Sequence, residues 1–468
     1  MKAFWLELKS VCKNFRFLAL ICILLCMQAM LIVQFQNESA VQHNKIIRAN
    51  NRYEMANNEW VEFWEGHDRY LQKHGVPRSI YSAEHIEHDL SWYRHEQKLA
   101  QEISAAYTAK DWSAYNLGMA KKTFINWQFN MNFFSQMNER DLKYFGIDSI
   151  PTPENYYGEN WVAYNKILSL PDGSQLPWYY DSKRFHMSLD KVIYSTSYYL
   201  YLSEKNMPPT SPSDTTSWAY VFNYLRRGLP HVLGIIVLLM SVNLMHRDRI
   251  FGSIKTTLQM PKKRGRYLLR KISLGFATSS FIVVIPQLLT FFILGIKSGF
   301  KGIDTPVLLT KNFLSLTLSA NEIFELRDYP WFSGLGLSKY AVSWLSGRNL
   351  LESMEFVPLW QFLLLAVIML TLFTLFCSVL ALLISVVCKN EILAQVVAVG
   401  VFILGSSFNR IFPKLRTSPF DLFTKADVIP ILEGSHCSTY LSSIAALLAA
   451  IILLFALSAL IFRRQDIK

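Results

Sequence analysis

Five uncharged apolar stretches constrain this chain more than any other feature. They cover residues 17–36, 228–246, 272–296, 358–388 and 441–462. A bilayer core of about 30 Å needs about 20 helical residues at 1.5 Å each, so each stretch can cross a membrane as a helix. Only 18% of the residues are charged, below the quarter that is usual in soluble domains. We therefore predict a mainly α-helical membrane protein and not a soluble enzyme.

A sixth apolar run adds one more crossing. Residues 392–409 follow the fourth stretch after Lys389, Asn390 and Glu391 alone. The combined length of residues 358–409 is too great for one crossing, which predicts two antiparallel helices joined by a tight turn. The expected count is six transmembrane helices.

The charges predict the orientation of these helices. Residues 1–16, 247–271, 389–391 and 463–468 together carry 17 Lys or Arg and four acids. Short loops rich in Lys and Arg stay in the cytoplasm. Both termini are therefore expected on the cytoplasmic side of the plasma membrane. The net charge of +12 comes mainly from these cytoplasmic segments, so it indicates a membrane protein and no nucleic-acid partner.

Successive segments between the spans lie on alternate sides of the membrane, which assigns the remaining segments to the outside. Residues 37–225 form an extracellular domain between the first two spans, large enough for its own core and expected to be mixed but mainly helical. Residues 297–357 form an external loop, and residues 410–440 an external or re-entrant segment. The extracellular domain has no cysteine, which suits a bacterial protein.

The first 16 residues predict an interfacial element. Phe4, Trp5, Leu8, Val11 and Phe15 fall on one helical face, whereas most of the basic residues lie elsewhere. Such a helix can lie in the headgroup plane, and a frayed basic tail is the alternative.

Motifs for catalysis are absent from the sequence. It contains no HExxH, no GxSxG and no GxxxxGK[ST] pattern. His85 and His88 can share a helix face, but a charged, solvated face explains them better than a metal site. We expect no catalytic residue, no metal site and no bound cofactor.

The cytoplasmic segment 247–271 is the most informative part of the chain. Ile250, Ile254 and Leu258 form an i, i+4, i+8 row with Phe251 beside it, and Pro261 ends the pattern. A short amphipathic helix between two spans can receive a push from a cytoplasmic partner. A basic loop without a partner is the alternative, but it explains only the charge.

This segment resembles the coupling segment of permeases of type-2 ATP-binding cassette (ABC) exporters. The matching positions are Gly252, Ser253, Ile254, Lys255, Leu258, Pro261, Arg264, Tyr267, Leu268 and Lys271. Residues 406–420 are similar to the family's external re-entrant segment. Members often carry a glutamate before the Gly-Ser/Thr-Ile unit, whereas Asp248 is the acid found here.

The resemblance implies a transport subunit and not an enzyme. Two copies of a separate ABC ATPase would hydrolyse ATP with magnesium, and a second copy of this chain or a related permease would complete the path. The implied ATPase-coupling residues are Arg249, Ile250, Phe251, Gly252, Ser253, Ile254, Lys255, Leu258, Pro261 and Arg264. The expected cargo is a hydrophobic peptide, an antimicrobial compound or a lipid-like molecule, which suggests antimicrobial peptide resistance. A membrane-anchored sensor or receptor is the alternative function.

Uncharged polar residues within the spans are candidates for the translocation path. Ser279, Gln287, Thr374 and Gln395 represent this group, although packing between helices explains such residues as well. Pro286 beside Gln287 is the best candidate for a hinge. The lack of a charged residue inside a span disfavours a proton-coupled carrier.

Overall fold

The computed structural model describes most of the helical part of the chain. The described residues are 15–74, 83–135, 198–209, 215–226, 229–250, 264–316, 354–407, 421–433 and 438–464. They divide into two compact units. The membrane unit comprises Met1–Asn37, Pro212–Phe324 and Val357–Lys468, and the inserted unit comprises Glu38–Ser211 and Glu325–Phe356.

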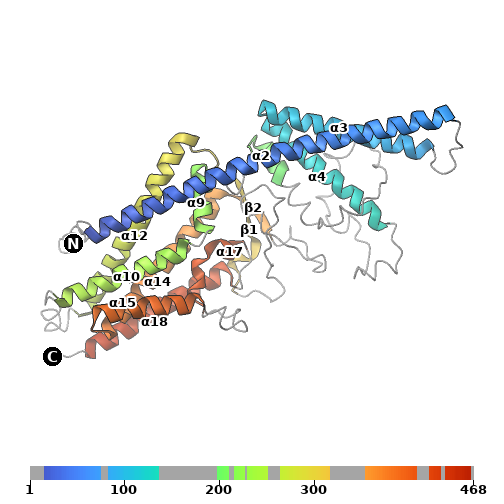
Figure 1. The fold of residues 1–468 in the computed structure, drawn as a ribbon. Coiled ribbons are helices and arrows are strands. Elements are labelled where there is room, and N and C mark those ends of the chain that lie inside the picture. Colours follow the sequence, from blue (N-terminus) through green and yellow to red (C-terminus); the bar gives the residue numbers. More distant parts are fainter. Residues whose placement is uncertain are drawn as a thin grey trace. The chain divides into compact units, whose positions relative to one another are not determined.

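The membrane unit is built mainly of long helices (Figure 1). Its helices are the first part of α2 (Phe15–His74), α9 (Ser217–Arg226), α10 (Leu229–Ile250), α12 (Arg264–Ser298), α14 (Leu359–Val387), α15 (Glu391–Ser406) and α18 (Tyr440–Arg464). The strands β1 (Pro306–Thr310) and β2 (Met354–Pro358) pair, and the short helices are η3 (Lys311–Leu314), η8 (Thr424–Ala426) and α17 (Val428–Leu432).

Four helices of the described residues are long and apolar enough to cross a membrane. They are α2, α12, α14 and α18. The helices α10 and α15 lie where the second and fifth spans are predicted, and α15 is shorter, with 16 residues. The fold is therefore that of a helical membrane protein, and the count of six crossings stays a prediction.

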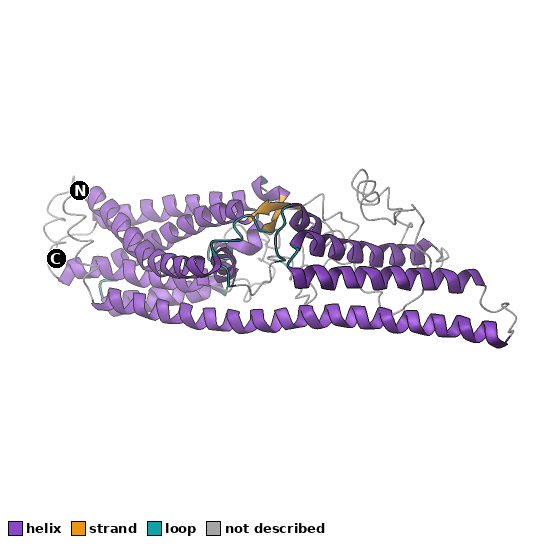
Figure 2. Cartoon of the chain, turned by 90° about the horizontal axis from the view of Figure 1, so that it is seen from above, coloured by secondary structure: helices purple, strands orange, loops and turns teal. Residues whose placement is uncertain are grey.

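The first predicted span ends at residue 36, but the helix does not. Helix α2 continues to His74, and its 60 residues correspond to about 90 Å (Figures 1 and 2). Residues 37–74 contain no proline and only one glycine, Gly66, so nothing in this sequence stops the helix. The predicted interfacial element at residues 1–16 lies almost entirely outside the described residues.

The core of the membrane unit lies between α10, α14, α15 and α18. Phe373, Phe376 and Leu380 of α14 pack there with Val237 and Leu447. Helix α15 contributes Ala394, Ala398 and Phe402, and its two alanines allow the helices to approach closely. The turn before α15 is capped by Asn390, whose side chain accepts hydrogen bonds from the backbone of Ile392 and Leu393.

The external or re-entrant segment predicted at residues 410–440 is described in part. It folds there into η8 and α17, which bury Val428, Ile429 and Ile431. Lys425 is fully buried and donates a hydrogen bond to Ser438. The segment is thus packed in its described part, and residues 410–420 and 434–437 lie outside the described residues.

The inserted unit is also helical where it is described. The later part of α2 packs with α3 (Ala83–Ala109) and α4 (Trp112–Ser135) around Trp64, Ile103 and Tyr115. Burial raises the pKa of Tyr115 above its ordinary value, so its phenol stays neutral. A short helix at residues 198–204 is tied to α4 by the hydrogen bond from the Ser113 hydroxyl to the Ser203 carbonyl, 3.0 Å long.

Close packing at Gly234 gives a test of the membrane core. A β-carbon at Gly234 would come within 2.4 Å of the Phe402 ring. Gly234→Ala should therefore lower the free energy of unfolding by about 1–3 kcal/mol, and Phe402→Leu in the same chain should restore part of the loss. Thermal unfolding in detergent measures both effects.

Gly400 on α15 is the matched control, because a β-carbon there meets nothing within 4 Å. Gly400→Ala should leave the unfolding temperature unchanged or raise it. Equal destabilisation by Gly234→Ala and Gly400→Ala would contradict the packing described here.

Candidate functional site

The start of the predicted coupling segment is anchored to the end of α14. Arg249 donates hydrogen bonds from its guanidinium to the carbonyl oxygens of Cys388, at 2.7 Å, and Val386, at 3.4 Å. The last four carbonyls of a helix have no partner within the helix, and positive charge is favourable there. Arg249 therefore holds the last turn of α10 against the end of α14.

The other end of the segment is anchored to α18 in the same way. Arg264, the first residue of α12, donates a hydrogen bond to the carbonyl oxygen of Arg463 at 2.7 Å. One turn later, the ring of Tyr267 stacks on Phe462 with the centroids 5.8 Å apart. These contacts fix the start of α12 on the last turns of α18.

A buried ion pair joins α10 to α12 between these two anchors. The Oδ2 atom of Asp248 lies 2.7 Å from Lys271 Nζ and accepts a 2.7 Å hydrogen bond from the Tyr267 hydroxyl. The side chain of Lys271 is 4% exposed and that of Asp248 is 18% exposed. A buried charge without its partner is costly, so this pair keeps the ends of α10 and α12 together.

The contacts bring three predicted cytoplasmic segments to one end of the membrane unit. Arg249 and Arg264 belong to residues 247–271, Cys388 adjoins the turn at residues 389–391, and Arg463 starts the tail at residues 463–468. Figure 1 shows the end of α10 beside the start of α12, with the end of α18 at the same end of the bundle. We call this group of contacts the inner-end network.

Only part of the predicted coupling set can be located. Arg249, Ile250 and Arg264 are described, and Ile250 ends α10 with 71% of its surface exposed. The other predicted residues lie outside the described residues: Phe251, Gly252, Ser253, Ile254, Lys255, Leu258 and Pro261. The Asp248–Lys271 pair was not predicted, although both residues flank apolar runs at the end expected to be cytoplasmic.

The four residues predicted for the translocation path lie on three helices, α12, α14 and α15. Gln395 donates a 2.6 Å hydrogen bond to Asn243 of α10, and Thr374 donates to the carbonyl of Leu370 one turn back. Ser279 is buried on α12, and no hydrogen bond engages it or Gln287 within the described part of the chain. No hydrogen bond joins any two of the four there.

A polar pair that the sequence did not predict joins α2 to α12. Gln28 is almost fully buried and accepts a hydrogen bond from the hydroxyl of Thr290. Thr290 lies four residues after Pro286, the predicted hinge, which is within α12. Both residues are polar and lie within apolar runs, but they are 262 positions apart, so no local pattern indicates their pairing.

The described residues contain no cluster of metal-binding side chains. No set of three or more His, Cys, Asp or Glu residues is close enough there to hold an ion. The side chains of His85 and His88 lie outside the described part. Among the described residues, the polar contacts of the membrane unit include the inner-end network, uncharged pairs between helices and the buried Lys425–Ser438 contact.

Comparison with protein families decides the class of this membrane protein. A sequence model of the family described as "ABC-2 family transporter protein" matches residues 1–467. The chain belongs to the ABC-2 transporter family. No curated protein and no solved structure matches it. This ABC-2 permease is a multi-pass membrane protein and a transport subunit, and the family match extends over the inserted unit as well as the helices.

The buried ion pair of this ABC-2 permease can be tested by substitution. Asp248→Ala should lower the free energy of unfolding by about 3–5 kcal/mol, because it leaves the Lys271 ammonium buried without its counter-ion. Combining Asp248→Ala with Lys271→Met should recover much of that loss. Thermal unfolding of the purified permease provides the measurement, and equal unfolding temperatures for the single and double variants would contradict the pairing.

Proposed function

We propose that this ABC-2 permease is the membrane subunit of an exporter driven by a separate ABC ATPase. The ATPase binds the segment between Arg249 and Arg264, and ATP with magnesium is bound and hydrolysed in that partner. The observation that carries this proposal is the anchoring of both ends of the segment to other helices. The family generally works with an ATPase subunit, which supports the assignment.

The inner-end network offers a mechanical route for this coupling. A push on the segment moves the end of α10, and Arg249 passes the movement to the end of α14. Arg264 passes it to the end of α18. Because Asp248 and Lys271 tie α10 to α12, these helix ends move together and not one by one.

The complete exporter contains two permease chains and two ATPase subunits. One chain of six helices has too few helices to enclose a path, so a second copy or a related permease completes it. Both termini face the cytoplasm of a bacterial cell, and the inserted unit lies outside. The charge asymmetry of the loops supports this orientation.

The cargo is a hydrophobic or amphiphilic molecule, such as a peptide, an antimicrobial compound or a lipid. The polar residues of the spans, including Ser279, Gln287, Thr374 and Gln395, are uncharged, which suits a cargo of this class. Export of antimicrobial peptides would give the cell resistance to them.

Coupling is tested by removing the anchors. Arg249→Gln and Arg264→Gln shorten the side chains and remove their charge, so neither can hold its helix end. We expect the permease-stimulated ATPase activity to fall about tenfold in each variant, with membrane insertion intact. The permease is co-expressed with ABC ATPases from the same genome, and ATP turnover of the purified complex is measured.

Arg266→Gln serves as the control, because Arg266 is an exposed arginine on the same first turn of α12. It should keep wild-type stimulation. Ile254→Pro, which breaks the predicted coupling helix, should abolish stimulation. Unchanged stimulation in Arg249→Gln, Arg264→Gln and Ile254→Pro would reject the proposed role of the segment.

The orientation has its own test. Single cysteines at Lys73 and Lys262, in a chain whose six native cysteines are replaced by serine, are exposed to a membrane-impermeant maleimide. Intact cells should label Lys73→Cys, and Lys262→Cys should react only after permeabilisation. Labelling of Lys262→Cys in intact cells would overturn the topology.

A further inference from the structure

Polar side chains from α2, α9 and α12 meet inside the membrane unit. Gln28 of α2 is 2% exposed and accepts a hydrogen bond from the hydroxyl of Thr290 on α12. Tyr224 of α9 also interacts with the Gln28 side chain, and its ring packs beside that of Tyr220 with the centroids 5.9 Å apart. Together with Gln287 of α12, these four residues form a group that we call the three-helix site.

Gln287 lies on the face of α12 that packs against α2 and α9. Val283, Gln287, Thr290 and Leu294 fall within about 60° of one another around the helix axis. Val283 and Leu294 both pack in the cluster that contains Phe35 of α2 and the two tyrosines of α9. Both polar atoms of the Gln287 amide are buried. The amide therefore lies between helices and not in contact with solvent.

Several hydrogen-bonding groups of the three-helix site have no partner within the described part of the chain. Gln287 has neither a donor for its Oε1 atom nor an acceptor for its Nε2 atom. The Tyr220 hydroxyl and the Nε2 atom of Gln28 also form no hydrogen bond there, although Tyr220 is fully buried. Each buried polar group that stays unpaired costs about 1–3 kcal/mol. The site therefore keeps groups that weaken the fold.

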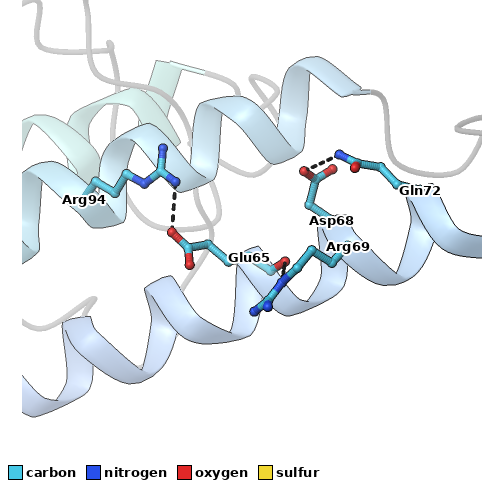
Figure 3. A network of polar contacts seen from close by, with 5 residues as sticks. All are labelled: Glu65, Asp68, Arg69, Gln72 and Arg94. Carbon is cyan, nitrogen blue, oxygen red and sulfur yellow. Dashed lines mark hydrogen bonds and ion pairs between the residues drawn. The ribbon is translucent and has the colours of Figure 1, made fainter.

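Polar side chains elsewhere in the described chain are paired even where water could serve as the partner. On the surface of the inserted unit, Glu65 pairs with Arg94 at 2.9 Å, and Asp68 accepts a 2.8 Å hydrogen bond from Gln72 (Figure 3). Among the described side chains, Gln287 alone has two buried polar atoms that both lack a hydrogen bond. A buried amide of this kind points to a ligand as its partner.

The unpaired groups specify the chemistry of that ligand. The Nε2 atoms of Gln28 and Gln287 need acceptors, whereas the Oε1 atom of Gln287 needs a donor. A lipid ester offers acceptors only. A charged group would be buried without a counter-ion, because no side chain of the three-helix site is charged. A secondary amide is uncharged and supplies both a donor and an acceptor.

We propose that the three-helix site binds a backbone amide of a hydrophobic peptide cargo. The N–H group of the peptide donates to the Oε1 atom of Gln287, and a peptide carbonyl accepts from the Nε2 atom of Gln287 or Gln28. Apolar side chains beside that amide pack against Phe35 and Leu294. The inference rests on the proposed function, because it selects peptides from the classes of cargo named there.

A peptide dissolved in the bilayer has a short route to the three-helix site. Other side chains of α2 and α12 are exposed and apolar, among them Met30 at 73% and Leu288 at 48%, and such side chains face lipid in a membrane. The site is therefore one helix away from lipid. Pro286 lacks a backbone N–H, so α12 can bend beside Gln287 and separate from α2.

Binding is measured with the full-length permease in phosphatidylcholine nanodiscs, without an ATPase. The probe is a tritiated acetyl-tetraleucine methylamide in which one side chain carries a photoreactive diazirine. Its matched analogue has esters in place of the two central amides, so it has the same shape but lacks those donors. We expect saturable labelling by the amide probe and at least fivefold weaker labelling by the ester probe.

Gln287→Leu removes the amide and keeps a side chain of similar size. It should weaken binding of the amide probe about tenfold, and the variant should no longer distinguish the amide probe from the ester probe. Thr371→Val is the control, because Thr371 is an exposed hydroxyl on α14 that is bonded to its own helix. This control should change affinity less than twofold.

The stability of Gln287→Leu separates a binding role from a structural one. The substitution removes two unpaired buried groups, so the unfolding temperature of the variant should equal or exceed that of the wild type. A lower unfolding temperature would show that the amide serves the fold, and it would count against the proposal.

Three binding results would overturn the proposal. They are labelling that does not saturate, equal affinity of the amide and ester probes for the wild type, and wild-type affinity of Gln287→Leu for the amide probe. Phosphatidylcholine surrounds the permease in this assay, so a site occupied by lipid would give the first of these results. ATP turnover is not measured here, so failure of this inference and failure of the exporter proposal are distinguishable.

Discussion

The carbonyl groups at the ends of α14 and α18 need hydrogen-bond donors, and the chain supplies them from the two ends of one segment. Arg249 and Arg264 lie on either side of residues 251–263 and donate to Cys388 and Arg463 respectively. Each contact satisfies a helix end and also joins helices that are distant in sequence. The same bonds therefore stabilise the membrane unit and link the segment to helices on both sides of it.

In the membrane unit, the described ion pair between α10 and α12 lies at the helix ends, where burying a charge costs less free energy than it does in the middle of a span. The ion pair between Asp248 and Lys271 lies at the inner-end network, where the Tyr267 hydroxyl adds a hydrogen bond to the carboxylate. Within the spans, the pair Gln28–Thr290 is uncharged, and Gln395 near the start of α15 donates to Asn243 and, at 3.4 Å, to Glu391. An uncharged amide or hydroxyl is tolerated between helices at much lower cost than an ion, and its bonds still fix the register of the helices.

Local pattern was enough to predict the class of fold. Apolar runs of sufficient length identify α12, α14 and α18, and the family match agrees with the resemblance seen in residues 252–271. The end of α2 was not predictable from the apolar run, because polar residues continue a helix as readily as apolar ones when no proline interrupts them. Helix length and span length are separate properties of such a sequence.

Pairings across the chain could not be predicted. Asp248 was noticed as a departure from the family pattern, but its partner Lys271 is 23 residues away on another helix, and only packing brings the two together. Arg249 and Arg264 were selected as candidates for coupling to an ATPase, which stays a prediction, and their hydrogen bonds to helix ends of the permease itself were not foreseen. A residue type and its position indicate the chemistry available, and the fold selects its partner.

We propose that an ATPase moves this permease through residues 251–263. A photo-crosslinking amino acid at position 254 tests it most directly, in membranes that contain the permease and its ATPase with ATP bound. If residues 251–263 contact the ATPase, position 254 crosslinks to it, and the crosslink disappears when the ATPase is omitted. Crosslinks to lipid alone, or to an extracellular component, would contradict it.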